Sequence, residues 1–301
     1  MLKAVEKIVA LAEEKKISFP EAVLILDSKE SGISPEEIRA RMAERLADMR
    51  RSVREACANT IPCRIEEPMG AKLRAHGGGM AGEFISAASA TAMEVASYNA
   101  VMGRIVAAPT AGSCGIIPGM IFAWEFFHGE GKNTDELLVG ALITAGAVGE
   151  VTAFRATLAG ADGGCQAECG AAAAMGSAAL VYLEGGSPAA CAHAAAMTFK
   201  SVLGLVCDPV GGLVECPCIK RNGILVANGI LCADMALAGI ESAIPLDEVI
   251  DSMGQIGRMM APALRETSQG GLAVTPTAAE IVKRIGETGK LGGQAYTDST
   301  I

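Results

Sequence analysis

The feature that most constrains this chain is a long stretch with very few charged side chains. Residues 81–200 carry only 14 charges in 120 positions, whereas the first 55 residues carry 22. The chain holds 53 Ala and 36 Gly but only 7 Phe, 3 Tyr and 1 Trp. Ala is the strongest helix former, and small side chains let helix backbones approach closely. The sequence therefore predicts tightly packed, buried helices behind a charged helical lead-in.

Helical patterns fill the charge-poor stretch, and strand signals are scarce because Gly or Pro soon interrupts any β-branched alternation. We expect helices that are apolar nearly all round, as at the centre of a domain, over residues 81–102, 137–156, 171–183, 188–205 and 225–240. The fold class predicted is all-α, with one compact helical domain over residues 1–301. Within it we expect a lead-in at 1–55, a buried core at 81–285 and a polar tail at 286–301.

One helix start in the lead-in has a clear signature. Ser34 is placed as the N-cap, Pro35 follows in the first turn, and Glu37 stands where a capping box would close. The apolar residues that follow it at three- and four-residue spacing predict a helix with one buried face.

Charge and hydropathy exclude several classes of function. The formal net charge is −9 and no basic stripe stands out, which disfavours nucleic-acid binding. The uncharged run from 105 to 124 has the length of a membrane span, but it contains Pro109 and Pro118 and is better explained as a buried loop. The first residues lack the basic-then-apolar pattern of a signal peptide. We expect a soluble, cytoplasmic protein without a membrane partner.

Ten cysteines in a chain without an export signal favour metal binding or catalysis over disulfides. The densest thiol segments are residues 164–170 and 207–218, and both lie in glycine-rich joints between apolar helices. Their spacing fits neither paired zinc knuckles nor the ferredoxin pattern. Spacing alone therefore leaves both a metal site and simple packing of buried thiols open.

Several long runs of residues resemble one known family, the α chain of iron–sulfur L-serine dehydratase. The resemblance covers nearly the whole chain, and the runs that carry it are residues 103–113, 163–168, 205–214, 217–222, 264–267 and 269–273. It implies a [4Fe–4S] cluster held by the thiolates of Cys165, Cys207 and Cys218. It also implies dehydration and deamination of L-serine to pyruvate and ammonia, with the iron that lacks a protein ligand acting as a Lewis acid.

Other residues of these runs are candidates for substrate contacts. Backbone N–H groups and hydroxyls of one loop could hold a substrate carboxylate, although a tight turn between helices would use the same residues. The polar residues after Cys218 could pair with substrate or with the cluster's negative charge, or simply begin a solvated helix. These candidates are Thr110, Ala111, Gly112 and Ser113, and Lys220, Arg221 and Asn222. We interpret Cys114, Cys169 and Cys216 as packing residues, with Cys216 as the substitute ligand to consider first.

The catalytic base is not evident in the sequence. Among the three histidines, His76 before three glycines is the best candidate, and none lies in the family runs. In the two-chain members of the family, a β chain carries a Ser-Ser-His-Thr motif that completes the site. We therefore expect a β-subunit partner, an oligomeric enzyme and a small amino-acid substrate.

Two alternatives stay open on the sequence. Residues 65–72 differ from the family's Gly-Gly-Asp-like stretch, so the substrate could instead be threonine or a cysteine-like thiol. The chain could also be a cluster-binding subunit without catalysis.

Overall fold

The chain folds into helices joined by short turns. The computed structural model describes residues 2–288, which contain no strand and only one isolated β-bridge, between Cys207 and Arg265. The helices in chain order are α1 Val5–Lys15, α2 Phe19–Ser31, α3 Pro35–Cys57, α4 Gly70–Ala75, α5 Gly82–Ala100, α6 Ile116–His128, α7 Thr134–Arg155, α8 Gly160–Gly163, α9 Ala171–Leu183, α10 Pro188–Ser201, α11 Cys218–Leu237, α12 Leu246–Met259 and α13 Pro276–Thr288. The predicted all-α, single-domain class is confirmed.

Shorter turns interrupt the loops between these helices. They are the 3₁₀ turns η1 Gly79–Ala81, η2 Ala111–Ser113, η4 Val210–Gly212, η5 Pro262–Leu264 and η6 Gly271–Val274, and the π-helical turn η3 Gln166–Gly170. The turn η3 runs directly into α9, so the two form one continuous helical stretch.

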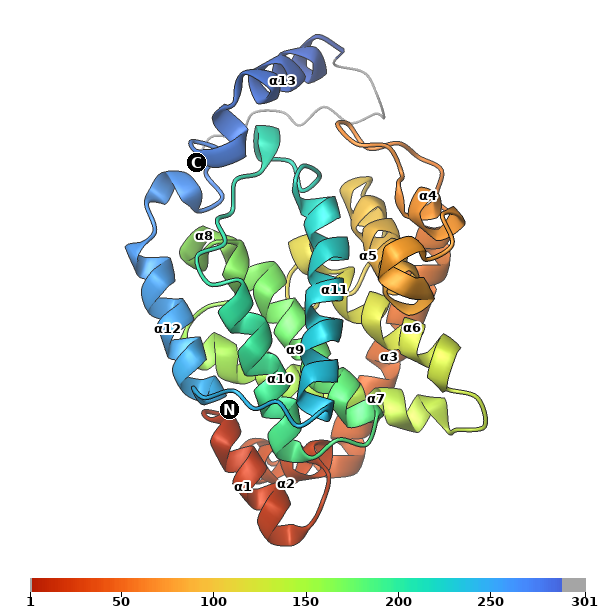
Figure 1. The fold of residues 1–301 in the computed structure, drawn as a ribbon, viewed down its shortest axis with the longest axis vertical. Coiled ribbons are helices and arrows are strands. Elements are labelled where there is room, and N and C mark those ends of the chain that lie inside the picture. Colours follow the sequence, from red (N-terminus) through yellow and green to blue (C-terminus); the bar gives the residue numbers. More distant parts are fainter. Residues whose placement is uncertain (1, 289–301) are drawn as a thin grey trace.

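Helix α9 lies at the centre of the bundle, packed against α6, α7, α10 and α11 (Figure 1). Its side chains are buried almost without exception, in agreement with the charge-poor pattern. Glycines let the neighbouring backbones approach. A β-carbon added at Gly229 of α11 would lie 3.0 Å from the Ala173 carbonyl oxygen, and one at Gly115 would lie 2.0 Å from the Ala92 carbonyl oxygen. Small residues thus set the spacing of the core helices.

The predicted helix boundaries are partly right. The range 171–183 coincides with α9, whereas the helix predicted over 188–205 already ends at Ser201. The helix predicted from 225 begins seven residues earlier, at Cys218. Lys220, Arg221 and Asn222 therefore lie in the first turns of α11. There they bond to residues outside the helix, namely Glu66, Asp208 and Gly112 respectively.

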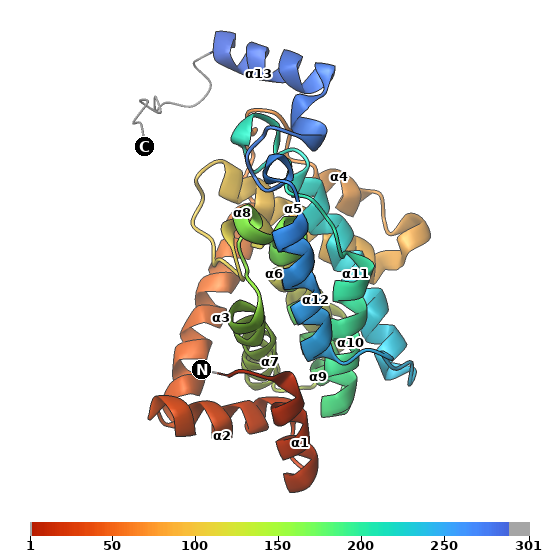
Figure 2. The ribbon, with the colours of Figure 1, turned by 90° about the vertical axis from the view of Figure 1, so that its left-hand side faces the viewer.

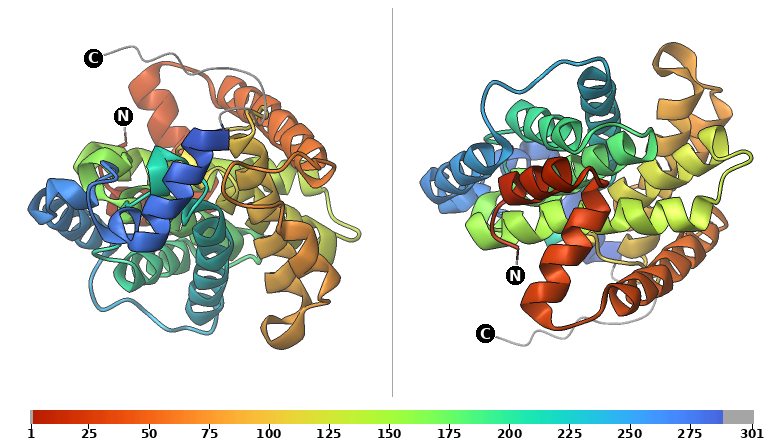
Figure 3. Two further views of the ribbon diagram at one scale, coloured as in Figure 1. Left: turned by 90° about the horizontal axis from the view of Figure 1, so that it is seen from above. Right: turned by 90° about the horizontal axis from the view of Figure 1, so that it is seen from below.

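Helices α1 and α2 cross the end of the bundle opposite α13, as the view from below shows (Figure 3). Helix α3 starts as predicted, with the Ser34 hydroxyl oxygen accepting a hydrogen bond from the Glu37 N–H at 3.2 Å. The expected capping box does not close. The Glu37 carboxylate instead pairs with Arg41 one turn along the helix, at 2.5 Å. Exposed ion pairs at i, i+4 spacing stabilise a helix.

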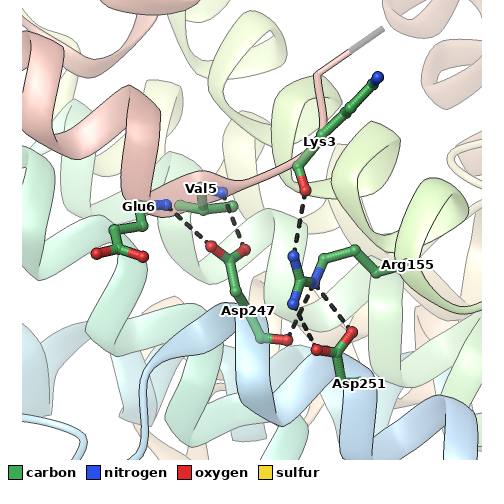
Figure 4. Close-up of polar contacts among 6 residues, drawn as sticks. All are labelled: Lys3, Val5, Glu6, Arg155, Asp247 and Asp251. Carbon is green, nitrogen blue, oxygen red and sulfur yellow. Dashed lines mark hydrogen bonds and ion pairs between the residues drawn. The ribbon is translucent and has the colours of Figure 1, made fainter.

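A cluster of carboxylates and one arginine fastens α1 to α12 (Figure 4). The buried carboxylate of Asp247 accepts hydrogen bonds from the N–H groups of Val5 and Glu6, at 2.9 and 3.1 Å, and so caps α1. Arg155 at the end of α7 pairs with Asp251 and donates to the Lys3 carbonyl oxygen. The lead-in is thereby joined to the body of the domain.

The uncharged run from 105 to 124 is only partly the buried loop that was expected. Residues 105–112 form a loop and the start of η2 that are half-buried to exposed, whereas the buried part, from Ser113 on, is mostly helix α6, which contains Pro118. Within residues 2–288, α7 alone has the length and apolar composition of a membrane-crossing helix. Of its most apolar window, 72% is buried inside the protein, which is usual for a core helix.

Helix α13 projects beyond the bundle and lies across its upper end (Figures 2 and 3). It packs on η4 and η6. The predicted polar tail was to begin at residue 286, but α13 continues to Thr288. The rest of that tail, residues 289–301, lies outside the described residues.

Candidate functional site

Three thiols converge at the end of the bundle that faces α13. Cys165 directly precedes η3, Cys207 lies in the loop after α10, and Cys218 is the first residue of α11. Cys165 and Cys207 are buried, and Cys218 is half-buried. The thiols are near enough to influence one another. Burial, together with the charge of Cys165, raises the pKa of Cys218 to about 12. Burial, together with the charges of Glu168 and Cys165, raises the pKa of Cys207 still further.

The Cys165 segment is held by its glycine and glutamine neighbours. Gly164 has a φ of +76°, and a β-carbon there would lie 2.8 Å from the Leu205 carbonyl oxygen. The buried amide of Gln166 donates to the carbonyl oxygens of Gly163 and Met253 and accepts from the Gly204 N–H. The sequence around Cys165 thus fixes this segment between α12 and the loop after α10.

The Cys207 segment is held by a part of the chain far along the sequence. The Cys207 N–H donates to the Leu264 carbonyl oxygen at 2.9 Å, and the Glu266 N–H donates to the Cys207 carbonyl oxygen at 2.7 Å. The next side chain, the buried Asp208 carboxylate, accepts from the Leu272 N–H at 2.8 Å. These hydrogen bonds place residues 264–267 and 269–273, two of the runs that resemble the family, directly beside Cys207 and Asp208.

Arg221 connects the Cys207 and Cys165 segments. Its guanidinium donates to Asp208 and to the Val206 carbonyl oxygen, both at 2.8 Å, and lies beside the Cys165 thiol. A hydrogen bond from the Cys169 thiol, aided by the Arg221 charge, lowers the pKa of Cys165. Within this buried pair of thiols, Cys165 is therefore the one that ionises first.

Asn222 ties the turn η2 to the start of α11. Its amide nitrogen donates to the carbonyl oxygens of Gly112, at 2.8 Å, and Cys218, at 3.0 Å. Its amide oxygen accepts from the Gly115 N–H at 3.1 Å. The Asn222 side chain thus brings the predicted substrate loop next to Cys218 and uses its own polar groups to do so.

Glu168 is the functional candidate that the sequence interpretation missed. Its carboxylate hydrogen bonds with Thr110 and lies 3.7 Å from the Cys207 Sγ atom. Oxygens of Glu168 and Glu266 and the Cys207 sulfur all fall within 4.8 Å of one another. Burial raises the pKa of Glu168. Its place three residues after Cys165, on the same helical face, was the signal available in the sequence.

A small residue opposite these groups leaves them room. A β-carbon at Gly160, in α8, would lie 2.6 Å from a Glu168 carboxylate oxygen and 3.1 Å from the Cys207 sulfur. The backbone at Gly160 therefore forms one wall of the site.

The remaining predicted residues occupy different surroundings. Thr110 and Ser113 share a hydrogen bond at 3.1 Å across η2, which also contains Ala111 and Gly112. Lys220 pairs with Glu66 at 2.5 Å. Among the other cysteines, Cys114 is buried, Cys216 is half-buried, and Cys169 contacts Cys165.

The three histidines lie elsewhere. His76 is exposed and directly follows α4, a helix that lies on the flank away from α8 (Figure 1). His128 pairs with Glu184 at 2.5 Å, and the Nδ1 atom of His193 accepts from the Ser242 N–H. In the part of the chain that the structure describes, no hydrogen bond joins a histidine to Cys165, Cys207 or Cys218.

Comparison with known proteins gives consistent matches along the chain. A family model described as "Serine dehydratase alpha chain" matches residues 7–273. The chain is 42% identical to a probable L-serine dehydratase alpha chain of Bacillus subtilis, over 99% of this chain and 100% of that protein. It is 41% identical to the L-serine dehydratase alpha chain of Peptoniphilus asaccharolyticus, over 93% of this chain and 97% of that protein.

A further relative, a probable L-serine dehydratase alpha chain of Latilactobacillus sakei, is 47% identical over 62% of this chain and 88% of its own length. The family match spans all three converging thiol segments and the residues that hold them. The chain thus belongs to the serine dehydratase alpha-chain family.

Proposed function

We propose that this chain is the α subunit of a cytoplasmic, iron–sulfur L-serine dehydratase, a lyase that converts L-serine to pyruvate and ammonia. The observation that carries the proposal is the convergence of Cys165, Cys207 and Cys218, from three separate segments, beside one half-buried arginine, Arg221. The names of the relatives supply the substrate.

The residues present fit a [4Fe–4S] cluster. Without metal, burial keeps the Cys207 and Cys218 thiols protonated, and a cluster would take the place of their protons. Thiolates are the ligands such clusters use, and Arg221 offsets part of their negative charge. Gly160 leaves space beside Cys207 that any larger residue would fill. When bound, such a cluster supplies a Lewis-acidic iron, because three thiolates leave one of four irons without a protein ligand.

The chain's own residues would bind and orient the substrate. The N–H groups and hydroxyls of Thr110, Ala111, Gly112 and Ser113 are proposed to bind the serine carboxylate, with Asn222 holding this turn against Cys218. Arg221 would hold Cys165 and Asp208 in place. Glu168, whose pKa burial raises, would hold a proton at a carboxyl oxygen near Thr110.

The description of the family as an alpha chain supports a multi-subunit enzyme. We propose that a β chain supplies the group that accepts the α-proton, and that the α chain by itself is inactive or nearly so. Pyruvate formation from L-serine, measured for the α chain with and without the β chain, tests this division of labour. Activity of the isolated α chain equal to that of the mixture would contradict it.

The cluster is tested by iron and acid-labile sulfide analysis of the chain after anaerobic reconstitution. We expect about four of each per chain, as a [4Fe–4S] cluster requires. Cys165→Ser, Cys207→Ser and Cys218→Ser should each lose most of both. The matched control is Cys191→Ser, a buried thiol in α10 outside the site. Zinc in place of iron, or full iron in the three variants, would contradict the assignment.

Because residues 65–72 are expected from the sequence to differ from the family's Gly-Gly-Asp-like stretch, the same assay should compare L-serine with L-threonine and L-cysteine. Release of sulfide from L-cysteine at a higher kcat/KM than pyruvate from L-serine would identify a thiol substrate. Reconstituted cluster without turnover of any of the three in the presence of the β chain would indicate a non-catalytic cluster-binding subunit.

A further inference from the structure

A buried carboxylate joins the Cys218 segment to a turn in the distant loop between α3 and α4. Glu215, only 2% exposed, accepts hydrogen bonds from three consecutive backbone N–H groups. These are the N–H groups of Arg64 at 3.0 Å, Ile65 at 2.6 Å and Glu66 at 3.2 Å. In Figure 1 this loop, in orange, reaches toward the upper end of α11.

This arrangement is more than a surface contact. An ionised carboxylate is costly to bury unless strong donors surround it, and successive N–H groups in a turn form a concave anion-binding site. Here the chain fills that site with its own Glu215 side chain. The turn is itself closed by a hydrogen bond from the Cys63 N–H to the Glu66 carbonyl oxygen at 3.1 Å. A second tie, from Lys220 to Glu66, joins the same turn to α11.

The position of Glu215 links this turn to a thiol of the site. Glu215 lies three residues before Cys218, and its carbonyl oxygen accepts from the Ile219 N–H at 2.9 Å, within the first turn of α11. The Cys216 carbonyl oxygen accepts from the Val210 N–H at 2.9 Å and so closes the loop that begins at Cys207. Any shift of Glu215 therefore moves the backbone that carries Cys218.

Each end of the Cys207–Cys218 loop is held by a buried carboxylate. One bonds to residues later in the sequence, and the other bonds to residues earlier in the sequence. Asp208 holds the first end to the Leu272 N–H, late in the sequence. Glu215 holds the second end to the Arg64–Glu66 turn, early in the sequence. Both use a buried carboxylate that accepts from backbone N–H groups, which fixes direction as well as distance.

We propose that Glu215 is a positioning residue for Cys218: its carboxylate fastens the Arg64–Glu66 turn to the loop and thereby fixes where the Cys218 thiol points. The inference rests on the proposed function for what that thiol binds, but the geometric part applies to the metal-free chain.

The first test uses the full-length, metal-free chain. Glu215→Gln removes the charge and replaces one acceptor oxygen by an NH₂ group, so at least one of the three N–H groups loses its partner. We expect faster hydrogen exchange at the amides of 64–66 and a several-fold faster reaction of Cys218 with N-ethylmaleimide. Reaction at Cys207 should be unchanged. Both are followed by peptide mass spectrometry.

Two controls separate positioning from loss of charge or of stability. Glu67→Gln makes the same charge change in the same loop, but Glu67 is exposed and pairs with Lys72 at 2.9 Å. Asp247→Asn weakens the cap of α1 far from the thiols. Neither should alter the Cys218 reaction rate at equal fractions of folded chain. If Glu215→Gln does not fold, Lys220→Met should change exchange at Glu66 and Cys218 reactivity in the same direction but less.

The second test uses the chain reconstituted with iron and sulfide. We expect Glu215→Gln to lose iron to a chelator several-fold faster than wild type and to change the visible circular dichroism of the cluster, which reports ligand geometry. Unchanged Cys218 reactivity in Glu215→Gln, with or without faster exchange at 64–66, would overturn the proposal. Failure of the wild-type chain to take up iron would overturn the proposed function instead, while the thiol-reactivity result would still decide the role of Glu215.

Discussion

The core around α9 and the end that carries the thiols are built by different means. In the core, backbones come together because glycines and alanines leave no side chain between them, as at Gly115 and Gly229. At the thiol end, charged side chains hold loops from distant parts of the chain: the buried Asp208 and Glu215 and the half-buried Arg221. The core therefore depends on volume, and the thiol end depends on specific donor and acceptor pairs.

The largest effect is expected from breaking the buried ion pair at the thiol end. Asp208→Ala leaves the Arg221 guanidinium without its carboxylate partner, and removing one partner of a buried pair costs about 3–5 kcal/mol. Urea unfolding of the metal-free chain measures this loss. The double variant Asp208→Leu with Arg221→Met removes both charges and should lose less than the single variant. A double variant that is less stable than Asp208→Ala would show that packing, rather than charge pairing, holds this end.

A smaller loss is expected from filling a close approach in the core. In Gly115→Ala the new β-carbon meets the backbone of Ala92, so α5 and α6 must separate, at about 1–3 kcal/mol. Gly146→Ala is the matched control in α7, because its β-carbon would meet only Met42 Cε at 3.9 Å. That change should stabilise the chain by up to about 1 kcal/mol. Equal unfolding midpoints for the two variants would refute the volume argument.

The thiol end should also respond to pH in a way that the core does not. Burial raises the pKa of Glu168 above its ordinary value of 4.5, so the metal-free fold prefers the protonated carboxyl. This stabilising contribution is complete below about pH 4.5 and is lost as the pH rises through the folded-state pKa. The free energy of unfolding of wild type should therefore fall relative to Glu168→Gln as the pH rises. Parallel curves from pH 4 to 8 would contradict this expectation.

The smallest effect is expected in the lead-in, at a helix cap remote from both regions. Ser34→Ala leaves the Glu37 N–H without its side-chain acceptor and should cost about 1 kcal/mol. Ser187→Ala removes the equivalent bond to the Ala190 N–H at the start of α10 and serves as a comparison within the core. Thermal unfolding should show similar, small shifts for both variants, with the reactivity of Cys165, Cys207 and Cys218 unaltered.

The helical core could be predicted from the sequence because its signals are local. A run of Ala and Gly without charge marks α9 wherever its neighbours lie, and Ser34 marks the start of α3. The cysteines were singled out by resemblance to a family. Their placement side by side is a property of the structure.

What the sequence could not show are relations between distant residues. Glu215 and Ile65 are 150 positions apart, and nothing local to either predicts their contact. The same holds for Asn222 and Gly112, where a residue expected to contact substrate instead holds the loop. Glu168 was missed because its one signal in the sequence, the spacing of three residues from Cys165, does not show that Thr110 and Cys207 lie beside its carboxylate. Contacts between distant residues thus determine how the site is assembled, whereas local sequence patterns determine where the helices form.

The hydrogen bonds between the Cys207 segment and residues 264–272 have a consequence for the timing of maturation. Cys165, Cys207 and Cys218 leave the ribosome before the residues that fix their arrangement, because the partners of Cys207 and Asp208 are synthesised afterwards. The complete set of three thiols therefore forms only after those late residues have emerged and docked. Under the proposed function, we expect uptake of iron and sulfide to require a chain in which residues 264–272 have already docked.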